Sequence, residues 1–105
     1  MSFCNLYLTC ANAEEASKIS KRLLEKHLIA CARQAQLENT HYWWEGKIVN
    51  DREILLIMES REDLFTDVEL EVAKLHSYET FVLQMIPVKR LNQKAAEWMA
   101  DNLVD

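Results

Sequence analysis

The chain contains 105 residues with a mass of 12.3 kDa, and a single domain over residues 1–105 is expected because domains usually contain about 100 to 200 residues. Half of the residues are hydrophobic and 28% are charged, a composition that excludes an intrinsically disordered chain. The formal net charge of -5 argues against nucleic acid as a partner, because such proteins neutralise phosphates with Lys and Arg, and a single glycine excludes a glycine-rich phosphate-binding loop.

The first predicted element is a strand over residues 3–10, where apolar and polar side chains alternate with the two-residue period of an extended chain. A helix follows, because Asn12 and Glu15 have the spacing of a capping box and apolar residues then recur at three- and four-residue steps. The residues expected on its buried face are Ala16, Ile19, Leu23, Leu24 and Leu28.

A hairpin is predicted next. Residues 29–44 have an extended pattern, and the only glycine lies in the segment 45–47, where a tight turn needs a residue that tolerates positive φ. Residues 48–58 form the returning strand. Its segment 54–57 is apolar on both faces, so both faces of the sheet need a cover at that point.

The second half of the chain repeats the alternation of helix and strand. Ser60 is expected to cap a second helix, whose buried face carries Leu64, Val68, Val72 and Leu75. Residues 81–88 form a fourth strand that Pro87 closes. Asn92 is then expected to cap a short last helix with inward-facing Ala95, Ala96, Met99 and Leu103.

This order of elements, β-α-β-β-α-β followed by a terminal helix, belongs to the α+β class. It matches the split βαβ or ferredoxin-like pattern, in which one antiparallel sheet carries its helices on one face. The other face would meet water, yet Tyr42, Trp43 and Trp44 are consecutive and must project alternately to opposite sides of their strand. Because uncovered aromatic residues usually mark an interface, we expect these three in contacts between identical subunits.

The residues that could carry chemistry are few. No G-x-S-x-G motif occurs and the three histidines are scattered, so we expect no catalytic residues and a protein that is not an enzyme. Cys4, Cys10 and Cys31 form no C-x-x-C pair, which excludes a zinc knuckle and a disulfide framework and predicts free thiols. Cys4 and Cys31 are interpreted as small buried hydrophobic residues.

Cys10 and His76 are the candidates for a metal site. Cys10 lies at a strand end and is equally compatible with a buried hydrophobic role and with a ligand role. His76 lies in a polar connection, where a binding role is more plausible than on an apolar helix face. Thiolate and imidazole favour a soft cation such as copper.

An acidic stripe on the second predicted helix, formed by Asp63, Asp67 and Glu71, is interpreted as a solvated face, because it offers no preorganised cage for a hard cation.

A membrane partner is not expected. No stretch reaches the ~18 consecutive apolar residues of a membrane span, and residues 1–10 carry no basic residue before their apolar run. The sequence therefore predicts a cytoplasmic protein.

Four segments carry a resemblance to the CutA family of divalent-ion tolerance proteins, and together they extend over most of the chain. They are Thr9 to Ala16, Leu28 to Cys31, Tyr42 to Ile48 and His76 to Thr80. The resemblance implies a ferredoxin-like subunit in a tight homotrimer, similar to the PII signal proteins, with the hairpin packed across subunits. It also implies a role in the response to divalent metal ions, copper above all, with no established enzymatic activity. We expect a divalent cation as the ligand and no organic cofactor.

The resemblance further implies that His76, Tyr78 and Glu79 lie in a cleft between subunits, with His76 as the metal ligand to test first. The cleft motifs depart from the family pattern at Ser77, which replaces a proline, and at Phe81 and Val82, which replace Pro-Glu. Arg33 replaces an asparagine, and Glu59 with Ser60 replaces Lys-Thr. The alternative function is a PII-like signalling or scaffolding trimer that binds a small metabolite or a protein partner in its clefts.

Overall fold

The computed structural model describes residues 2–105, and its elements follow the predicted order. The strands are β1 (Phe3–Cys10), β2 (Cys31–Trp44), β3 (Lys47–Arg61) and β4 (Leu83–Pro87). The helices are α1 (Ala13–Glu25), α2 (Phe65–Leu75) and α3 (Gln93–Asn102), with a 3-10 turn, Glu62–Leu64, before α2. The fourth strand is therefore shorter than the predicted range 81–88.

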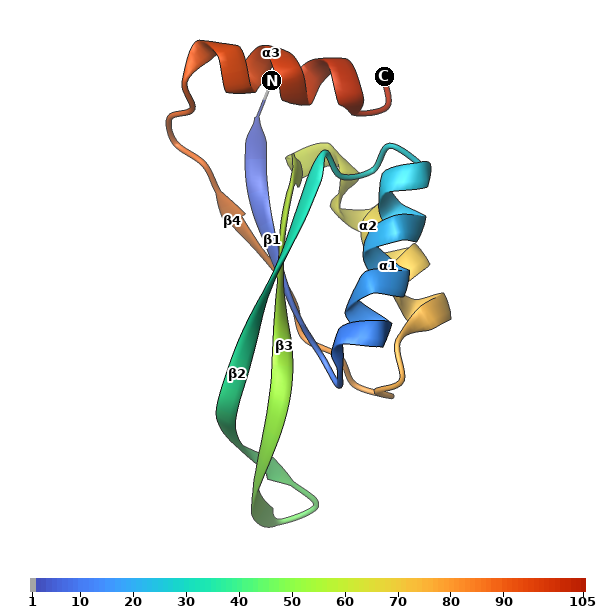
Figure 1. The fold of residues 1–105 in the computed structure, drawn as a ribbon, viewed down its shortest axis with the longest axis vertical. Coiled ribbons are helices and arrows are strands. Elements are labelled where there is room, and N and C mark those ends of the chain that lie inside the picture. The colour runs from blue at the N-terminus through green and yellow to red at the C-terminus, as the bar shows by residue number, and fades with distance from the viewer. Residues whose placement is uncertain (1) are drawn as a thin grey trace.

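All strand pairs are antiparallel, and the sheet order is β2-β3-β1-β4. Figure 1 shows α1 and α2 side by side on one face of the sheet, with α3 across the end where β1 begins. This arrangement confirms the α+β, ferredoxin-like fold. No helix among residues 2–105 is long and apolar enough to cross a membrane.

The hydrophobic core lies between β1, β3 and the two helices α1 and α2. Every second residue of β1 is fully buried, as the alternation predicts, and α1 contributes the predicted inward residues Ala16, Ile19 and Leu23. Leu24 was expected in the core but lies in solvent, because it follows the buried Leu23 around the helix by about 100°. The buried apolar residues of the sheet and helices include Leu6, Leu8, Ile19, Leu23, Leu56, Met58, Val68 and Val72.

Helix α1 ends earlier than its apolar pattern suggests. His27 adopts a left-handed backbone with φ 57°, and the N–H groups of His27 and Leu28 donate to the carbonyls of Leu24 and Leu23 at 3.0 Å. These two bonds form a Schellman motif, which satisfies the last carbonyls of the helix. Leu28 therefore reaches the core from beyond the helix.

The predicted role of Ser60 as a helix cap is wrong. Strand β3 continues to Arg61, and the buried Ser60 hydroxyl donates a hydrogen bond to the carbonyl of Leu28 at 2.6 Å. The 3-10 turn then leads into α2, whose first turn has no side-chain cap. Asn92 precedes α3 as predicted, although its side chain makes no capping bond there, whereas Asn12 accepts from the Glu15 N–H at 2.9 Å.

The β2–β3 hairpin reaches well beyond the rest of the sheet (Figure 1), and the molecule measures 45 × 26 × 20 Å. Its turn uses two residues of positive φ, Glu45 at 49° and Gly46 at 76°, as type I′ turns require. Trp43 is 72% exposed, and Trp44 and Ile48 are also exposed. Trp43 and Trp44 are therefore uncovered in the isolated subunit, as the sequence predicts.

The acidic stripe on α2 is not uniformly solvated as predicted. Glu71 is buried, because Arg22 of α1, Lys26 directly after α1 and Lys74 of α2 surround its carboxylate. Asp63 and Asp67 remain exposed.

Candidate functional site

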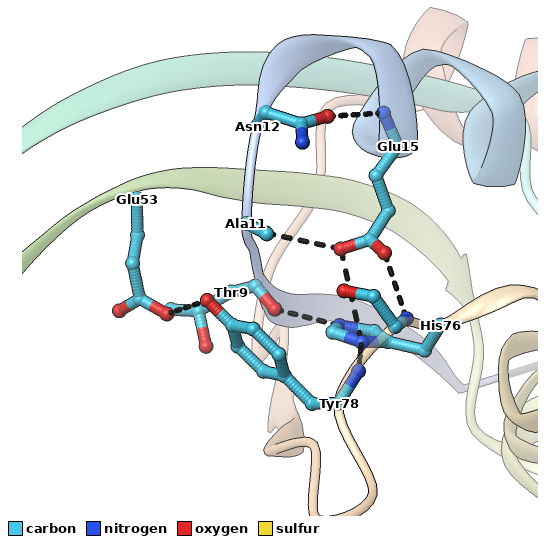
Figure 2. Close-up of polar contacts among 8 residues, drawn as sticks. Thr9, Ala11, Asn12, Glu15, Glu53, His76 and Tyr78 are labelled. Atoms are coloured by element: carbon cyan, nitrogen blue, oxygen red, sulfur yellow. Dashed lines mark hydrogen bonds and ion pairs between the residues drawn. The ribbon is translucent and has the colours of Figure 1, made fainter.

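Three side chains that carry ligand atoms meet where β1, α1 and α2 end or begin. Cys10 is the last residue of β1, Glu15 lies in the first turn of α1, and His76 directly follows α2. Their sulfur, oxygen and nitrogen ligand atoms lie within 4.8 Å of one another. Figure 2 shows Glu15 and His76 turned toward one another. The fold thus brings the two predicted metal ligands together and adds Glu15, which sequence reasoning treated only as part of a helix cap.

Glu15 joins two segments that are distant in the sequence. Its Oε1 accepts from the Ala11 N–H at 3.0 Å and its Oε2 accepts from the Ser77 N–H at 2.7 Å (Figure 2). Burial raises the pKa of this carboxyl, but the hydrogen bonds from Ser77 and Ala11 and the nearby His76 outweigh burial, so the pKa is lowered. Glu15 is therefore an anion that holds the loop after α2 against the start of α1.

The imidazole of His76 is fully buried and has a partner for each ring nitrogen. Nε2 lies 2.8 Å from the Thr9 carbonyl, so it carries the hydrogen and donates, while Nδ1 accepts from the Tyr78 N–H at 3.0 Å. The ring also stacks on Phe81, with centroids 5.3 Å apart. Nδ1 lies 3.8 Å from Glu15 Oε1. The two side chains form an ion pair only if the imidazole is protonated.

The thiol of Cys10 is also fully buried. Burial, with smaller contributions from the negative charges of Glu15 and Glu53, raises its pKa to about 12. The group therefore holds its proton near neutral pH. Cys4, Cys10 and Cys31 are all free thiols, as predicted.

The chemistry of this donor set fits a divalent cation of the borderline or soft kind, because thiolate, imidazole and carboxylate are the usual ligands of zinc and copper. The fit has a cost. A bound cation must displace the proton of Cys10 and take a ring nitrogen of His76 away from Thr9 or Tyr78.

A cavity of about 690 Å³ lies beside these residues, between the hairpin and the chain after α2. Five residues named from the sequence, two as ligand-binding and three as interface residues, line it: Tyr78, Glu79, Tyr42, Trp43 and Trp44. The Tyr78 hydroxyl donates to Glu53 Oε2 at 2.8 Å, as Figure 2 shows. The sequence did not identify Glu53 as a residue of this cavity. Its only unusual feature in the sequence is a charge directly before the apolar segment 54–57 of the returning strand.

The chain matches the sequence model of the CutA1 divalent ion tolerance proteins over residues 4–102. It belongs to the CutA1 family. The divalent-cation tolerance protein CutA of Archaeoglobus fulgidus is 37% identical over 98 residues, which cover 93% of this chain and 95% of that protein. The CutA of Pyrococcus horikoshii is 35% identical over 96 residues, which cover 91% of this chain and 93% of that protein.

Solved CutA structures share the fold. The structure of the periplasmic divalent cation tolerance protein CutA from Archaeoglobus fulgidus superposes with a TM-score of 0.92 at 36% identity, covering 95% of this chain and 97% of that one. The CutA1 structure from Oryza sativa reaches a TM-score of 0.95 at 28% identity, covering 100% of this chain and 96% of that one. Membership of the family makes this chain a divalent-cation tolerance protein.

Several departures from the CutA pattern have partners within this subunit. Arg33 and Glu59 form an ion pair, with Nη1 and Oε1 2.5 Å apart across β2 and β3. Phe81 stacks on His76, and the backbone N–H of Ser77, which a proline would lack, donates to Glu15. Phe81 and Ser77 therefore contact the candidate ligands directly, whereas the Arg33–Glu59 pair lies further along β3, where Glu59 faces Asn5 of β1.

Proposed function

We propose that this protein takes part in divalent-cation tolerance by binding copper, or another divalent cation of similar preference, through Cys10, Glu15 and His76. The observation that carries the proposal is the convergence of one sulfur, one carboxylate and one imidazole within 4.8 Å. The set matches the ligand preference of copper and zinc.

Access to the three side chains supports the same proposal. The chain neighbours of the ligands, Thr9 beside Cys10 and Ser77 beside His76, line the cavity next to the site. Loading the site requires the segment after α2 to move, because the N–H groups of Ser77 and Tyr78 donate hydrogen bonds to Glu15 and to Nδ1 of His76. Movement of this loop frees Nδ1 of His76 from the Tyr78 N–H.

We further propose that the protein is a cytoplasmic homotrimer and binds its cation without catalysis. The exposed aromatic residues of the hairpin support self-association. The raised pKa of Cys10 argues against a catalytic thiol, since a nucleophilic cysteine needs a lowered pKa.

The experiment is native mass spectrometry of the protein titrated with Cu²⁺, and separately with Zn²⁺, at pH 7.5. We expect one ion per subunit, lost in Cys10→Ser and in His76→Ala. Cys31→Ser is the matched control, because Cys31 is a free and less buried thiol on β2 that lies outside the candidate site.

Unchanged stoichiometry in Cys10→Ser and His76→Ala would overturn this site. Loss of copper in Cys31→Ser alone would assign the binding to an adventitious thiol. Circular dichroism of each variant separates loss of the ligand from loss of the fold.

A further inference from the structure

A groove between α1 and α2 forms a second cavity, on the side of the molecule where the two helices cover the sheet (Figure 1). Its volume is about 350 Å³, within the range of roughly 300 to 1,000 Å³ that ligand pockets occupy. None of its lining residues belongs to the hairpin or to the candidate metal site. The groove is therefore separate from the metal site and from the aromatic residues expected between subunits.

The lining follows two stripes, one on each helix, in which residues recur at steps of three and four. The members are Lys18, Lys21, Arg22 and Glu25 of α1, and Glu71, Lys74 and Leu75 of α2. Such steps place side chains on one face of a helix, so both stripes face the groove. Among residues 2–105, the lining has a single apolar side chain and no aromatic ring, so a ligand is held there by charge and hydrogen bonds.

The groove is positive although the chain is negative. Its lining holds four basic and two acidic residues, whereas the whole chain has a formal net charge of -5. Glu71 does not balance this charge, because its single carboxylate already contacts the cations of Arg22, Lys26 and Lys74. Glu25, the other acid of the lining, is exposed and has no ion pair within residues 2–105. An anion in the groove therefore meets an excess of positive charge.

Several donors in the groove have no partner within the subunit. Lys18 and Lys21 have no ion pair with any residue in the range 2–105. Arg22 contacts Glu71 through Nε, which leaves the terminal nitrogens of its guanidinium for another acceptor. Ammonium and guanidinium groups are common donors to phosphate oxygens in proteins. These donors therefore favour a phosphate-bearing ligand over a neutral one.

The spread of the donors decides the form of the phosphate. Lys18 and Arg22 lie about 6 Å apart along the axis of α1, since each helical residue advances by about 1.5 Å. Linked phosphate groups match this spread, whereas a single phosphate matches only one of the two positions. We propose that the groove binds a compact oligophosphate, with two or more linked phosphate groups against Lys18, Lys21 and Arg22.

The test is isothermal titration calorimetry of the metal-free protein with pyrophosphate as the probe, at a fixed ionic strength. We expect saturable binding of one pyrophosphate per subunit. Orthophosphate should bind about tenfold more weakly, since it carries less charge and reaches fewer donors. ADP carries a diphosphate on a nucleoside and should bind no more tightly than pyrophosphate, because the lining offers no aromatic ring for stacking.

Lys18→Gln and Lys21→Gln should each weaken pyrophosphate binding about threefold, and the double variant about tenfold, as expected for exposed charges. Neither change breaks an ion pair of this subunit, so we expect the fold to be kept. Lys94→Gln is the matched control, because it removes one exposed positive charge from α3, outside the groove. This variant should bind pyrophosphate as the wild-type protein does.

Equal affinity of the double variant and Lys94→Gln would overturn the inference, because binding would then not depend on the groove. Equal affinity for pyrophosphate and orthophosphate, or tighter binding of ADP, would overturn the assignment to an oligophosphate. The absence of saturable binding in both calorimetry and phosphorus NMR would also overturn it. The use of metal-free protein keeps these outcomes independent of the copper titration.

Discussion

At the scale of single residues, Glu71 shows how a charge that looks solvated in the sequence becomes buried in the fold. Its Oε2 lies 2.9 Å from Lys74 Nζ, and its Oε1 lies 3.1 Å from Arg22 Nε and 3.2 Å from Lys26 Nζ. The hydrogen bonds from Lys74, and then those from Lys26 and Arg22, outweigh the effect of burial and lower the pKa of Glu71 to about 2. Arg22 lies in the last turn of α1 and Lys26 directly follows it, so the carboxylate joins the two helices.

The lowered pKa makes the free energy of unfolding depend on pH. Between about 2 and the ordinary value of 4.5, the unfolded chain binds a proton that the folded chain does not. The contribution of Glu71 is therefore complete above pH 4.5 and is lost as the pH falls through this window. We expect Glu71→Gln to lower stability at pH 7 and to flatten the loss of stability between pH 4.5 and pH 2.

Urea denaturation at a series of pH values, at one protein concentration, measures this effect. Glu69→Gln is the control, because Glu69 is exposed on the same helix. This variant should show the same pH dependence of stability as the wild-type protein. Parallel curves for Glu71→Gln and the original protein across the acidic window would contradict the assignment.

At the scale of the elements, the tip of the hairpin carries a residue poorly suited to its conformation. Glu45 has φ 49°, in the left-handed region that costs a residue with a β-carbon about 1 to 2 kcal/mol, and it is followed by Gly46 at 76°. Asn tolerates this region better, and Asn-Gly is the preferred pair for a type I′ turn. The turn is therefore not optimised for hairpin stability.

We expect Glu45→Asn to stabilise the protein by about 0.5 to 1 kcal/mol and Gly46→Ala to destabilise it by about 1 to 2 kcal/mol. No atom lies within 4 Å of a β-carbon built at Gly46, so the loss comes from the backbone and not from a clash. Thermal and urea unfolding of the two variants measure both signs. Changes of the same sign would contradict a type I′ constraint at this turn.

The elements also show where sequence patterns are sufficient and where they are not. The alternation of β1 and the cap of α1 by Asn12 depend on neighbours in the chain, so their structures were predictable, although the Glu15 carboxylate accepts from Ala11 and not from Asn12 as a full capping box requires. The role of Ser60 was not predictable, because its partner is the carbonyl of Leu28, which lies 32 residues away. The pattern of residues around Ser60 does not indicate that the loop after α1 brings the Leu28 carbonyl next to the Ser60 hydroxyl.

The candidate sites follow the same rule. The sequence singled out Cys10, His76 and the aromatic run, because their residue types are unusual in their positions. It did not identify Glu15 as a partner of Ser77, or Glu53 as a partner of Tyr78, since these contacts bridge 62 and 25 residues of chain. Carboxylates are common, and only tertiary contacts distinguish these two from the others.

At the scale of the whole molecule, the isolated subunit exposes more surface than a compact protein of its mass. Its accessible area is 6971 Å², whereas a monomer of 12.3 kDa usually exposes about 6,100 Å². The long hairpin accounts for this shape, and its far end carries Trp43, Trp44 and Ile48 in exposed positions. A projecting hairpin with an apolar tip gains stability only when another surface covers it.

The last prediction concerns that surface. If Trp43 and Trp44 are buried between subunits, truncation of either to Ala removes about 2 kcal/mol or more of association free energy from each contact. Sedimentation velocity over a dilution series should then show trimers for the wild-type protein at concentrations where both variants have dissociated.

Trp98→Ala is the matched control, because Trp98 is 45% exposed, close to the 48% of Trp44, but lies on α3, far in the chain from the hairpin. Dissociation of the Trp98 variant alone would move the interface to α3, and trimers at every dilution in all three variants would remove the hairpin aromatics from it. Dissociation confined to Trp43→Ala and Trp44→Ala would instead explain why a 12.3 kDa chain keeps two indoles in water: they are exposed only in the separated subunit.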